Sequence, residues 1–250
     1  MANAAPAAIN ADGRFDNFRQ QRTFVEGFED YVSGRLWTLT TADSATAVLT
    51  AAAAGLQGGQ LVVSAAGATL NDEAYVFRTV SQMLFEDGVS FRVKSRIKFA
   101  QAATNKAAIH FGLLNAPAAN AIVDTTGVPK SSFSGALIYT KADSIYWQAG
   151  CSVGTALQTT ASSKIAGGSS IQELEISIQC NNGVAVIEYF VDGVQLLYEE
   201  SFGVSIPIKH SLTYSGAAAM TGYFGMKQCS ATQQAMTILG YAEQLTYGPW

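Results

Sequence analysis

The sequence predicts an all-β protein that folds as a two-sheet sandwich or a barrel. About a dozen short segments alternate in the manner of strands, and turn signals separate them at intervals of roughly 8–15 residues. No segment has the period of a long amphipathic helix, and nothing repeats at the roughly 20–50-residue period of propellers and solenoids. Many short strands, each with one apolar face, are typical of sandwiches and barrels.

The segment from residue 89 to residue 99 is the clearest of the predicted strands. Apolar or small residues alternate along it with cations and one serine, without a break. Neighbouring side chains of a strand point to opposite faces, so one face of this strand is dry and the other carries a row of positive charges. One dry and one wet face indicate antiparallel sheets that pack on one side. We expect the sandwich to bury Val89, Phe91, Val93, Ile97 and Phe99 and to leave outside Arg92, Lys94, Arg96 and Lys98.

Shorter strands are expected before and after this segment. They share an alternating or short apolar pattern bounded by turn residues, and they lie at residues 36–41, 60–65, 75–80, 108–114, 136–141 and 144–149. Residues 115–133 predict a loop, because they carry Pro117, Gly127 and Pro129. Ala142-Asp143 closes the last two strands into a hairpin.

The C-terminal part predicts a three-strand meander. A strand with apolar residues at 174, 176 and 178 ends at Asn181-Asn182-Gly183, residues that tolerate positive φ and favour a tight turn. The return strand at 184–191 reaches Asp192-Gly193, a second turn signal, and a third strand follows at 194–198. Two closing strands are expected at 222–227 and 236–247.

Length and composition indicate one large domain with an arm. The chain has 250 residues, and no linker divides it after residue 22, so we expect an N-terminal arm at 1–22 and one domain at 23–250. Only 14% of the residues are charged, against about 25% in typical domains. Two explanations stay open: subunit interfaces, whose centres are poor in charge, or a composition rich in small residues without any partner.

Several partner classes are disfavoured. The net charge of −4 and the pI near 5.2 argue against a nucleic-acid binder. No apolar stretch approaches the roughly 18 residues of a membrane span, and the N-terminus lacks the basic start and apolar run of a secretory signal. Three widely spaced cysteines do not suggest a disulfide framework, so we expect a soluble protein made in a reducing compartment.

The arm combines aromatic and basic side chains with small residues. Phe15, Phe18 and Arg22 would share one face of a short helix. Large aromatic residues and arginine are enriched at interface hot spots. A frayed terminus is the alternative. If the arm docks onto a partner, the candidate partner-binding residues are Arg14, Phe15, Phe18, Arg19 and Arg22.

Several segments, taken in chain order, carry a family resemblance. They are Phe28-Glu29-Asp30-Tyr31 with Leu36-Trp37-Thr38, the glycine-led strand 58–63, the strand 90–99 before Ile109-His110-Phe111-Gly112-Leu113, the hairpin Tyr189-Phe190-Val191-Asp192-Gly193, and Gly222-Tyr223-Phe224-Gly225-Met226 before the strand 236–245. Over roughly residues 25–248 this order resembles the concanavalin A-like lectin/glucanase jelly roll, also called laminin-G-like, whose hairpin has the pattern Y-x-V-D-G.

This resemblance implies a two-sheet antiparallel jelly-roll sandwich. The family includes glycoside hydrolases, lectins, and the decoration, cement or fibre-base proteins of tailed-phage virions. The Ala/Gly/Thr-rich, cysteine-poor composition and the short arm are most similar to the virion group. Since one fold hosts many functions, the site residues must decide among them.

Catalytic residues of a glycosidase are not evident in the sequence. A retaining glycosidase needs two carboxylates about 5 Å apart, and the glucanase branch carries them on one strand in an E-x-D-x-x-E pattern that is absent here. Glu173 and Glu175 are the nearest candidates, two residues apart on one face of a strand. We expect them instead to face the cations of a neighbouring strand, where opposite charges stabilise a sheet.

Other motifs also give no catalytic or metal site. The sequence has no G-x-S-x-G, Walker loop or G-x-G-x-x-G. His110, His210 and the cysteines show no metal-ligand spacing, and we expect both histidines at the surface. The clusters Asn71-Asp72-Glu73 and Asn181-Asn182 read as turns rather than calcium sites.

Three aromatic residues are candidates for carbohydrate binding. Trp37, Tyr146 and Trp147 are of the kind that sugar binders expose, although packing in the core is the favoured role. Neighbouring residues of a strand face opposite ways, so of Tyr146 and Trp147 one should be buried and the other should face outward.

The leading hypothesis is a non-enzymatic virion structural protein without a cofactor. It would be a decoration or cement protein on the exterior of a tailed-phage capsid, made in the host cytoplasm, that binds the major capsid protein and bridges capsomers. A homo-oligomer is expected, and a trimer is favoured because closed symmetry suits three-fold positions on a shell. The first alternative is a carbohydrate-binding module or adhesin for a host-surface glycan, and the second is a glycoside hydrolase-like enzyme. Neither nucleic acid nor membrane is an expected partner.

Overall fold

The structure is a computed structural model, and its regular elements are all strands. It describes residues 21–28, 36–42, 50–51, 60–64, 70–80, 83–100, 107–115, 117, 121–200, 203–215, 218–230 and 235–248. Within these residues there is no helix long and apolar enough to cross a membrane.

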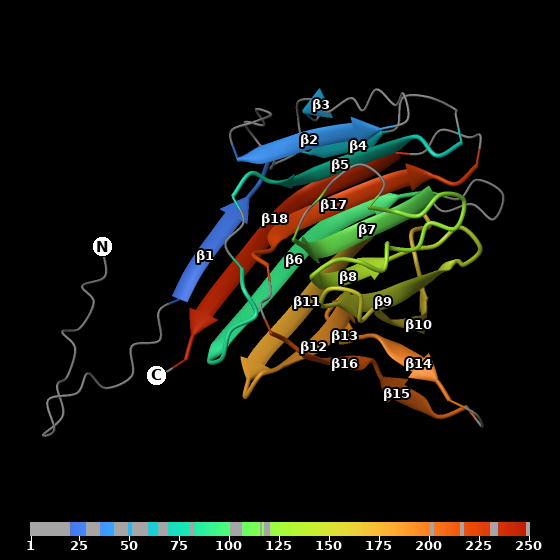
Figure 1. The fold of residues 1–250 in the computed structure, drawn as a ribbon. Helices are drawn as coiled ribbons and strands as arrows, with labels where there is room; N and C mark the ends of the chain where they lie inside the picture. The colour runs from blue at the N-terminus through green and yellow to red at the C-terminus, as the bar shows by residue number, and fades with distance from the viewer. Residues whose placement is uncertain are drawn as a thin grey trace, which may run out of the picture.

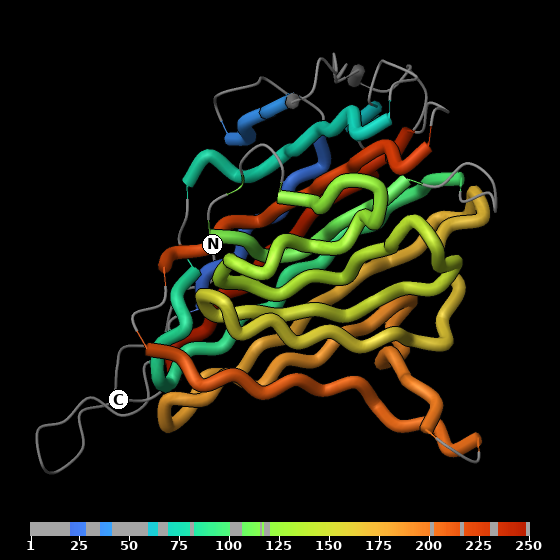
Figure 2. Tube along the Cα trace, turned by 45° about the vertical axis from the view of Figure 1, so that its right-hand side comes forward, coloured from blue at the N-terminus to red at the C-terminus, as the bar shows by residue number. Residues whose placement is uncertain are grey.

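Two large antiparallel sheets form two layers, which Figures 1 and 2 show stacked on each other. The nine-stranded sheet consists of β1 (Gln21–Glu26), β3 (Thr50–Ala51), β4 (Leu61–Ser64), β6 (Val89–Phe99), β11 (Ile171–Asn181), β12 (Val184–Val191), β13 (Val194–Gln195), β16 (Lys209–Thr213) and β18 (Ala235–Tyr247). The seven-stranded sheet consists of β2 (Trp37–Ala42), β5 (Glu73–Arg78), β7 (Ala107–Leu114), β8 (Gly135–Tyr139), β9 (Tyr146–Ser152), β10 (Gln158–Ile165) and β17 (Thr221–Gln228). A separate hairpin of β14 (Leu197–Glu199) and β15 (Ser205–Pro207) projects from one corner.

The strand order brings distant parts of the chain together. The nine-stranded sheet runs β13-β12-β11-β6-β18-β4-β3, with β1 also beside β18 and β16 also beside β12. The seven-stranded sheet runs β10-β9-β8-β7-β17-β5-β2. The last long strand, β18, therefore lies beside β6, and β17 lies between β5 and β7. This non-consecutive order confirms the two-sheet antiparallel sandwich that the sequence predicts.

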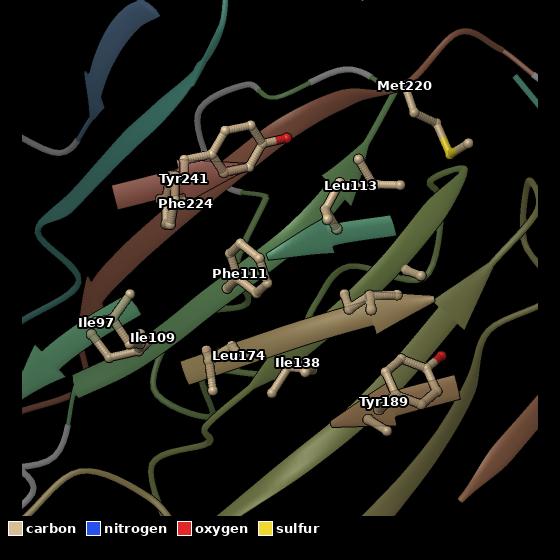
Figure 3. Close-up of a cluster of buried hydrophobic side chains, with 14 of the residues drawn as sticks. Ile97, Ile109, Phe111, Leu113, Ile138, Leu174, Tyr189, Met220, Phe224 and Tyr241 are labelled. Atoms are coloured by element: carbon tan, nitrogen blue, oxygen red, sulfur yellow. The ribbon is translucent and has the colours of Figure 1, made fainter. Parts of the chain in front are cut away.

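The main core fills the space between the two sheets. Inward-facing residues of both layers are fully buried there, as Figure 3 shows for ten labelled side chains that include Ile97, Phe111, Leu174 and Phe224. The strand predicted at 89–99 has these bounds in the structure. Its five predicted apolar residues are buried and its four cations are not, which confirms the expected register.

The turns of the meander are also confirmed. Asn182 and Gly183 have φ of 51° and 74°, and Asp192 and Gly193 have φ of 55° and 74°. Two consecutive residues with positive φ match the sharp reversal that joins β11 to β12 and β12 to β13.

The structure differs from the sequence prediction at the margins of the sheets. The strand predicted at 194–198 is split: β13 pairs with β12 for two residues, and β14 pairs with β15. The strands β1, β3, β10, β15 and β16 were not predicted. Arg22, assigned to the arm, lies in β1, where its backbone pairs with Leu245 of β18.

The seven-stranded sheet has a second core on its outer face. Strands β7, β8 and β17 are buried at every residue. Their inward side chains join the main core, whereas outward residues such as Leu137, Tyr139 and Tyr223 pack with Ile122 and Phe133 in a separate cluster. Ile122 and Phe133 belong to residues 121–134, which we call the covering segment. Residues 121–133 of the predicted loop thus form a third layer over this sheet.

Candidate functional site

Charged side chains gather at the centre of the nine-stranded sheet, on the face that points away from the main core. We call this set the charged face, and it comprises Arg92, Lys94, Arg96 and Lys98 of β6 with Glu173 and Glu175 of β11. These two strands are neighbours in the sheet (Figure 1). Their antiparallel register places Glu173 opposite Arg96 and Glu175 opposite Lys94.

Ion pairs connect one half of the charged face. Lys94 Nζ lies 2.7 Å from Glu173 Oε1 and 3.7 Å from Glu175 Oε2, and Arg92 Nε lies 3.1 Å from Glu175 Oε1. The expectation that the two glutamates face the cation row is therefore confirmed. Exposed ion pairs of this kind contribute only about 0.2–1 kcal/mol each to stability. Both carboxylates are therefore paired with cations of β6.

The other half of the charged face carries uncompensated cations. Arg96 and Lys98 are exposed, and no carboxylate within the described part of the chain forms an ion pair with either. On the β18 side, the residue opposite Arg96 is Gly240 and the residue opposite Lys98 is Thr237. Small neighbours leave both cations accessible, so an anionic group of a partner could approach them directly.

Two shallow hollows lie at the ends of the cation row. The hollow beside Lys98 has a volume of about 450 Å³, and the hollow beside Arg92 has a volume of about 220 Å³. The first is lined by polar groups that include Gln60, Ser169 and Thr237, and the second by Ser177, Gln179 and Gln244. Hydroxyl and amide groups beside a cation offer hydrogen bonds to a polar partner surface or to a sugar.

The outer face of the seven-stranded sheet contains a different, closed polar cluster. Lys227 of β17 and Glu73 of β5 have completely buried side chains, and Lys227 Nζ lies 2.8 Å from Glu73 Oε2. Asp124 of the covering segment forms a second ion pair with Lys227, and the hydroxyl of Tyr75 donates to Glu73. Burial lowers the pKa of Lys227, but the hydrogen bonds to Asp124 and Glu73 outweigh burial and raise this pKa above its ordinary value.

The position of Glu73 corrects the sequence prediction. The cluster Asn71-Asp72-Glu73 was expected to be a turn, but Glu73 opens β5 and lies at the centre of the closed cluster. Its partners Asp124 and Lys227 are far away in the sequence, so no local pattern identifies them. One signal was present: Lys227 shares a strand face with Tyr223, whose ring packs in the second core.

Both histidines are buried, which corrects the expectation of surface positions. His110 points away from Ile109 and Phe111, as expected, but the covering segment lies over that side, and Nε2 donates to the carbonyl of Gly127 at 2.8 Å. His210 of β16 lies between Tyr189 Oη at 3.0 Å and Thr160 Oγ1 at 2.9 Å. Burial lowers the pKa of each to about 4.

The aromatic candidates divide as the strand geometry requires. Trp147 is fully buried and its indole donates to Gln172 at 3.2 Å, whereas its neighbour Tyr146 is 40% exposed. This confirms that one of the pair is buried. Trp37 is buried against Phe28. Of the three aromatic residues suggested for sugar stacking, Tyr146 alone has an accessible ring.

Of the five predicted partner-binding residues of the arm, the structure describes one, Arg22. Arg14, Phe15, Phe18 and Arg19 lie outside the described residues. Arg22 is exposed in β1 and lines a hollow of about 220 Å³ together with Phe24, Arg78 and Glu243.

Sequence reasoning missed the ion pair beneath this hollow. Arg78 and Glu243 form an ion pair, and the guanidinium of Arg78 lies 3.8 Å from the centre of the Phe24 ring. The arrangement anchors β1 on the sandwich.

Metal ligands do not gather anywhere in the described residues, where no three His, Cys, Asp or Glu side chains form a cluster. Cys151, Cys180 and Cys229 are free thiols.

Comparison with known proteins identifies the architecture. No protein-family model and no curated protein sequence matches the chain. Solved structures do match it. A peanut lectin with a 9mer peptide aligns with a TM-score of 0.60 and 10% identity over 92% of this chain and 99% of that chain. The fold is a concanavalin A-like jelly roll.

Two further structures share the concanavalin A-like fold. The Emp47p carbohydrate recognition domain aligns with a TM-score of 0.55 and 8% identity over 91% of this chain and 95% of that chain. An endo-1,3-beta-glucanase from Streptomyces sioyaensis aligns with a TM-score of 0.55 and 12% identity over 99% and 100%. At these identities the likeness establishes the fold alone. The resemblance inferred from the sequence segments is confirmed at that level.

Proposed function

We propose that this protein is a non-enzymatic structural protein that binds a partner assembly through the charged face. In its specific form it is a decoration or cement protein on the exterior of a tailed-phage capsid, where a rigid jelly roll bridges neighbouring capsomers. The observation that carries the non-enzymatic part is the closed outer face of the seven-stranded sheet. There the covering segment fills the face with a second core, and Glu73 is fully buried in an ion pair with Lys227, out of reach of an external substrate.

The charged face supports the binding part of the proposal. It is broad, built on long paired strands, and carries exposed Arg96 and Lys98 without acidic partners among the described residues. Rigid scaffolds present such side chains at little conformational cost. Arginine can form two parallel hydrogen bonds with a carboxylate, which suits an acidic protein surface.

Cosedimentation tests this proposal directly. The protein is mixed with purified shells of the tailed phage whose genome encodes the chain, and bound protein is measured in the pellet. The double variant Arg96→Glu and Lys98→Glu should lose binding at least tenfold, because attraction becomes repulsion. The matched control Lys141→Glu changes a cation in the β8–β9 hairpin, where it pairs with Asp143 at 3.2 Å, and should bind as wild type does. Equal binding by both variants would rule out the charged face.

The size of the protein in solution tests the assembly part. Light scattering on the isolated chain and on the shell-bound form would distinguish a monomer from the trimer proposed here. A monomer that remains monomeric in both states would remove the trimer from the proposal.

Carbohydrate binding is the second candidate function. The likeness to a peanut lectin and to the Emp47p carbohydrate recognition domain supports it at the level of fold. The hollow beside Lys98, which has both polar and apolar lining, and the exposed ring of Tyr146 are the features of this chain that favour it. Retention on a glycan array, lost in Tyr146→Ala or Lys98→Ala, together with no binding to shells, would place this function first.

A further inference from the structure

The amine of Lys227 is surrounded by three oxygen acceptors. Its Nζ lies 2.8 Å from Glu73 Oε2 and 3.1 Å from the carbonyl oxygen of Ile122, and it contacts Asp124 Oδ1. An ammonium has three protons to donate, so each is directed at one acceptor. The group is therefore held in one orientation, with a carboxylate on each of two sides.

The surroundings of this amine are dry on the protein side. The side chains of Lys227 and Glu73 are fully buried, and the stacked rings of Tyr75 and Tyr223 lie beside them, 5.9 Å apart. The hydroxyl of Tyr75 fixes the Glu73 carboxylate by a hydrogen bond. Asp124 is different: its side chain is 56% exposed, so one side of the cluster opens to solvent.

We propose that Lys227 and Asp124 are a covalent cross-linking site, in which the amine and the carboxyl group condense to an amide (isopeptide) bond with Glu73 as the proton carrier. The arrangement provides the three parts that such a reaction needs: an oriented amine, a carboxyl group in contact with it, and a second carboxylate that does not react but moves protons.

The atoms and protons balance in three steps. The proton between Nζ and Asp124 Oδ1 first passes to Asp124, which leaves a neutral amine whose lone pair points at a neutral carboxylic acid. Nζ then attacks Cγ of Asp124 and gives the proton that faces Glu73 to the Glu73 carboxylate. Glu73 finally returns this proton to the departing hydroxyl, which leaves as water through the exposed side of Asp124. The remaining N–H proton still faces the carbonyl of Ile122.

Two opposing effects act on the first step. The hydrogen bonds from the Lys227 amine to Glu73 and Asp124 favour its charged form, and burial of the amine opposes them by disfavouring that form. The neutral amine is therefore a minor species, which the attack on Asp124 consumes. The water that is formed leaves through the exposed side of Asp124, and on the other side the buried side chains of Lys227 and Glu73 exclude water from the new amide.

The product would fasten the covering segment to β17. Asp124 lies in that segment and Lys227 lies in the strand below, 103 positions further along the chain. A covalent link between distant positions restricts the unfolded chain, as a disulfide does. The three cysteines of this protein are all free, so this cross-link would supply a constraint that they do not. The proposal does not depend on which partner the charged face binds.

Intact-protein mass spectrometry of the full chain tests the proposal. The reference is Lys227→Arg, which keeps the positive charge but cannot form this amide. After correction for the substitution, the wild-type protein should be lighter than this reference by about 18 Da, the mass of one water. Trypsin should then release one linked pair, residues 107–130 joined to residues 210–250, because a modified Lys227 is no longer cleaved.

Two variants test the assigned roles. Glu73→Gln should keep its full mass, because the proton carrier is lost. The matched control Glu188→Gln removes a half-buried carboxylate that pairs with Lys209 at 2.8 Å, and it should still lose one water.

A wild-type mass equal to the mass calculated from the sequence would overturn the proposal, because Lys227 and Asp124 would then form an ion pair only. The proposal is also overturned by loss of water without the linked peptides, because a succinimide at Asp124 gives the same mass change. Since the wild-type protein decides both outcomes, a variant that fails to fold does not obscure the result.

Discussion

Replacing Ile122 by alanine tests whether the covering segment belongs to the folded core. Ile122 is fully buried in the second core, and its backbone pairs with Pro129 within the segment. Its side chain lies over β17 at Gly225, where an added Cβ would be 3.2 Å from Ile122 Cδ1. Ile122→Ala removes this packing but leaves the backbone hydrogen bonds in place.

The expected loss of stability is that of a true core residue. Truncation of a buried isoleucine to alanine costs about 2–5 kcal/mol, because apolar burial is lost and a cavity remains. For a chain of this size, a loss of about 3 kcal/mol lowers the Tm by roughly 6–12 °C. The same substitution at Ile165, which is 57% exposed at the end of β10, should change stability by less than about 0.5 kcal/mol.

Thermal and urea unfolding of the two variants measure this difference. If Ile122→Ala costs no more than Ile165→Ala, the covering segment opens freely and contributes little to the folded state. The outer face of the seven-stranded sheet would then be accessible, Glu73 could reach a ligand, and the structural basis for a non-enzymatic function would be lost.

Three further predictions concern catalysis, pH and the arm. Changing Glu173 and Glu175 together to glutamine should not weaken binding to shells, because it removes no cation from the charged face; hydrolysis of a β-glucan panel by the wild type that this double variant abolishes would establish an enzyme instead. The free energy of unfolding should be at its full value above pH 6.5 and should fall toward pH 4, because His110 and His210 have folded-state pKa values of about 4 and protonate first in the unfolded chain. Each histidine contributes about 3 kcal/mol to this fall at most. The urea midpoint of His210→Gln should therefore change less with pH than that of the wild type. Deleting residues 1–20, which leaves β1 whole, should preserve the circular dichroism spectrum and the Tm but abolish shell binding or oligomerisation; unchanged binding would exclude the arm as a contact.

Strict alternation made part of the fold predictable from the sequence. The strand from Val89 to Phe99 has the same bounds in prediction and structure, because a period of two permits one register when one face is buried. The turns at Asn182-Gly183 and Asp192-Gly193 were equally predictable, since few residues accept positive φ. Alternation also placed Glu173 and Glu175 on one strand face, and the suggestion that they meet the cation row is confirmed by the pairing of β11 with β6.

The burial of the two histidines could not be predicted by the same reasoning. Alternation places His110 on the face opposite Phe111, but it does not say what covers that face. In the structure residues 121–134 cover it, and this contact depends on tertiary packing of a segment that has no period of its own. His210 escaped prediction because β16 is a short strand next to proline, and its inward side is set by pairing with β12.

The closed cluster of Glu73, Asp124 and Lys227 could not be predicted from the sequence, for a related reason. Glu73, Asp124 and Lys227 come from two strands and a loop that lie far apart in the chain. Each alone has an ordinary local explanation: a turn residue, a loop residue and a surface lysine. Only the pairing of β5 with β17 brings the two strand residues together, and that pairing is a property of the sheet order rather than of either segment.

The low charge of the chain now has a cause inside the domain. The sequence left two explanations open for a charged fraction of 14%, namely subunit interfaces or an unusual composition. In the structure, β7, β8 and β17 are buried on both faces, so residues that would face water in a one-sided sheet instead form a second core. A chain with two cores needs more apolar and small residues than a simple sandwich of the same length. The second core therefore accounts for the charge deficit without any subunit interface.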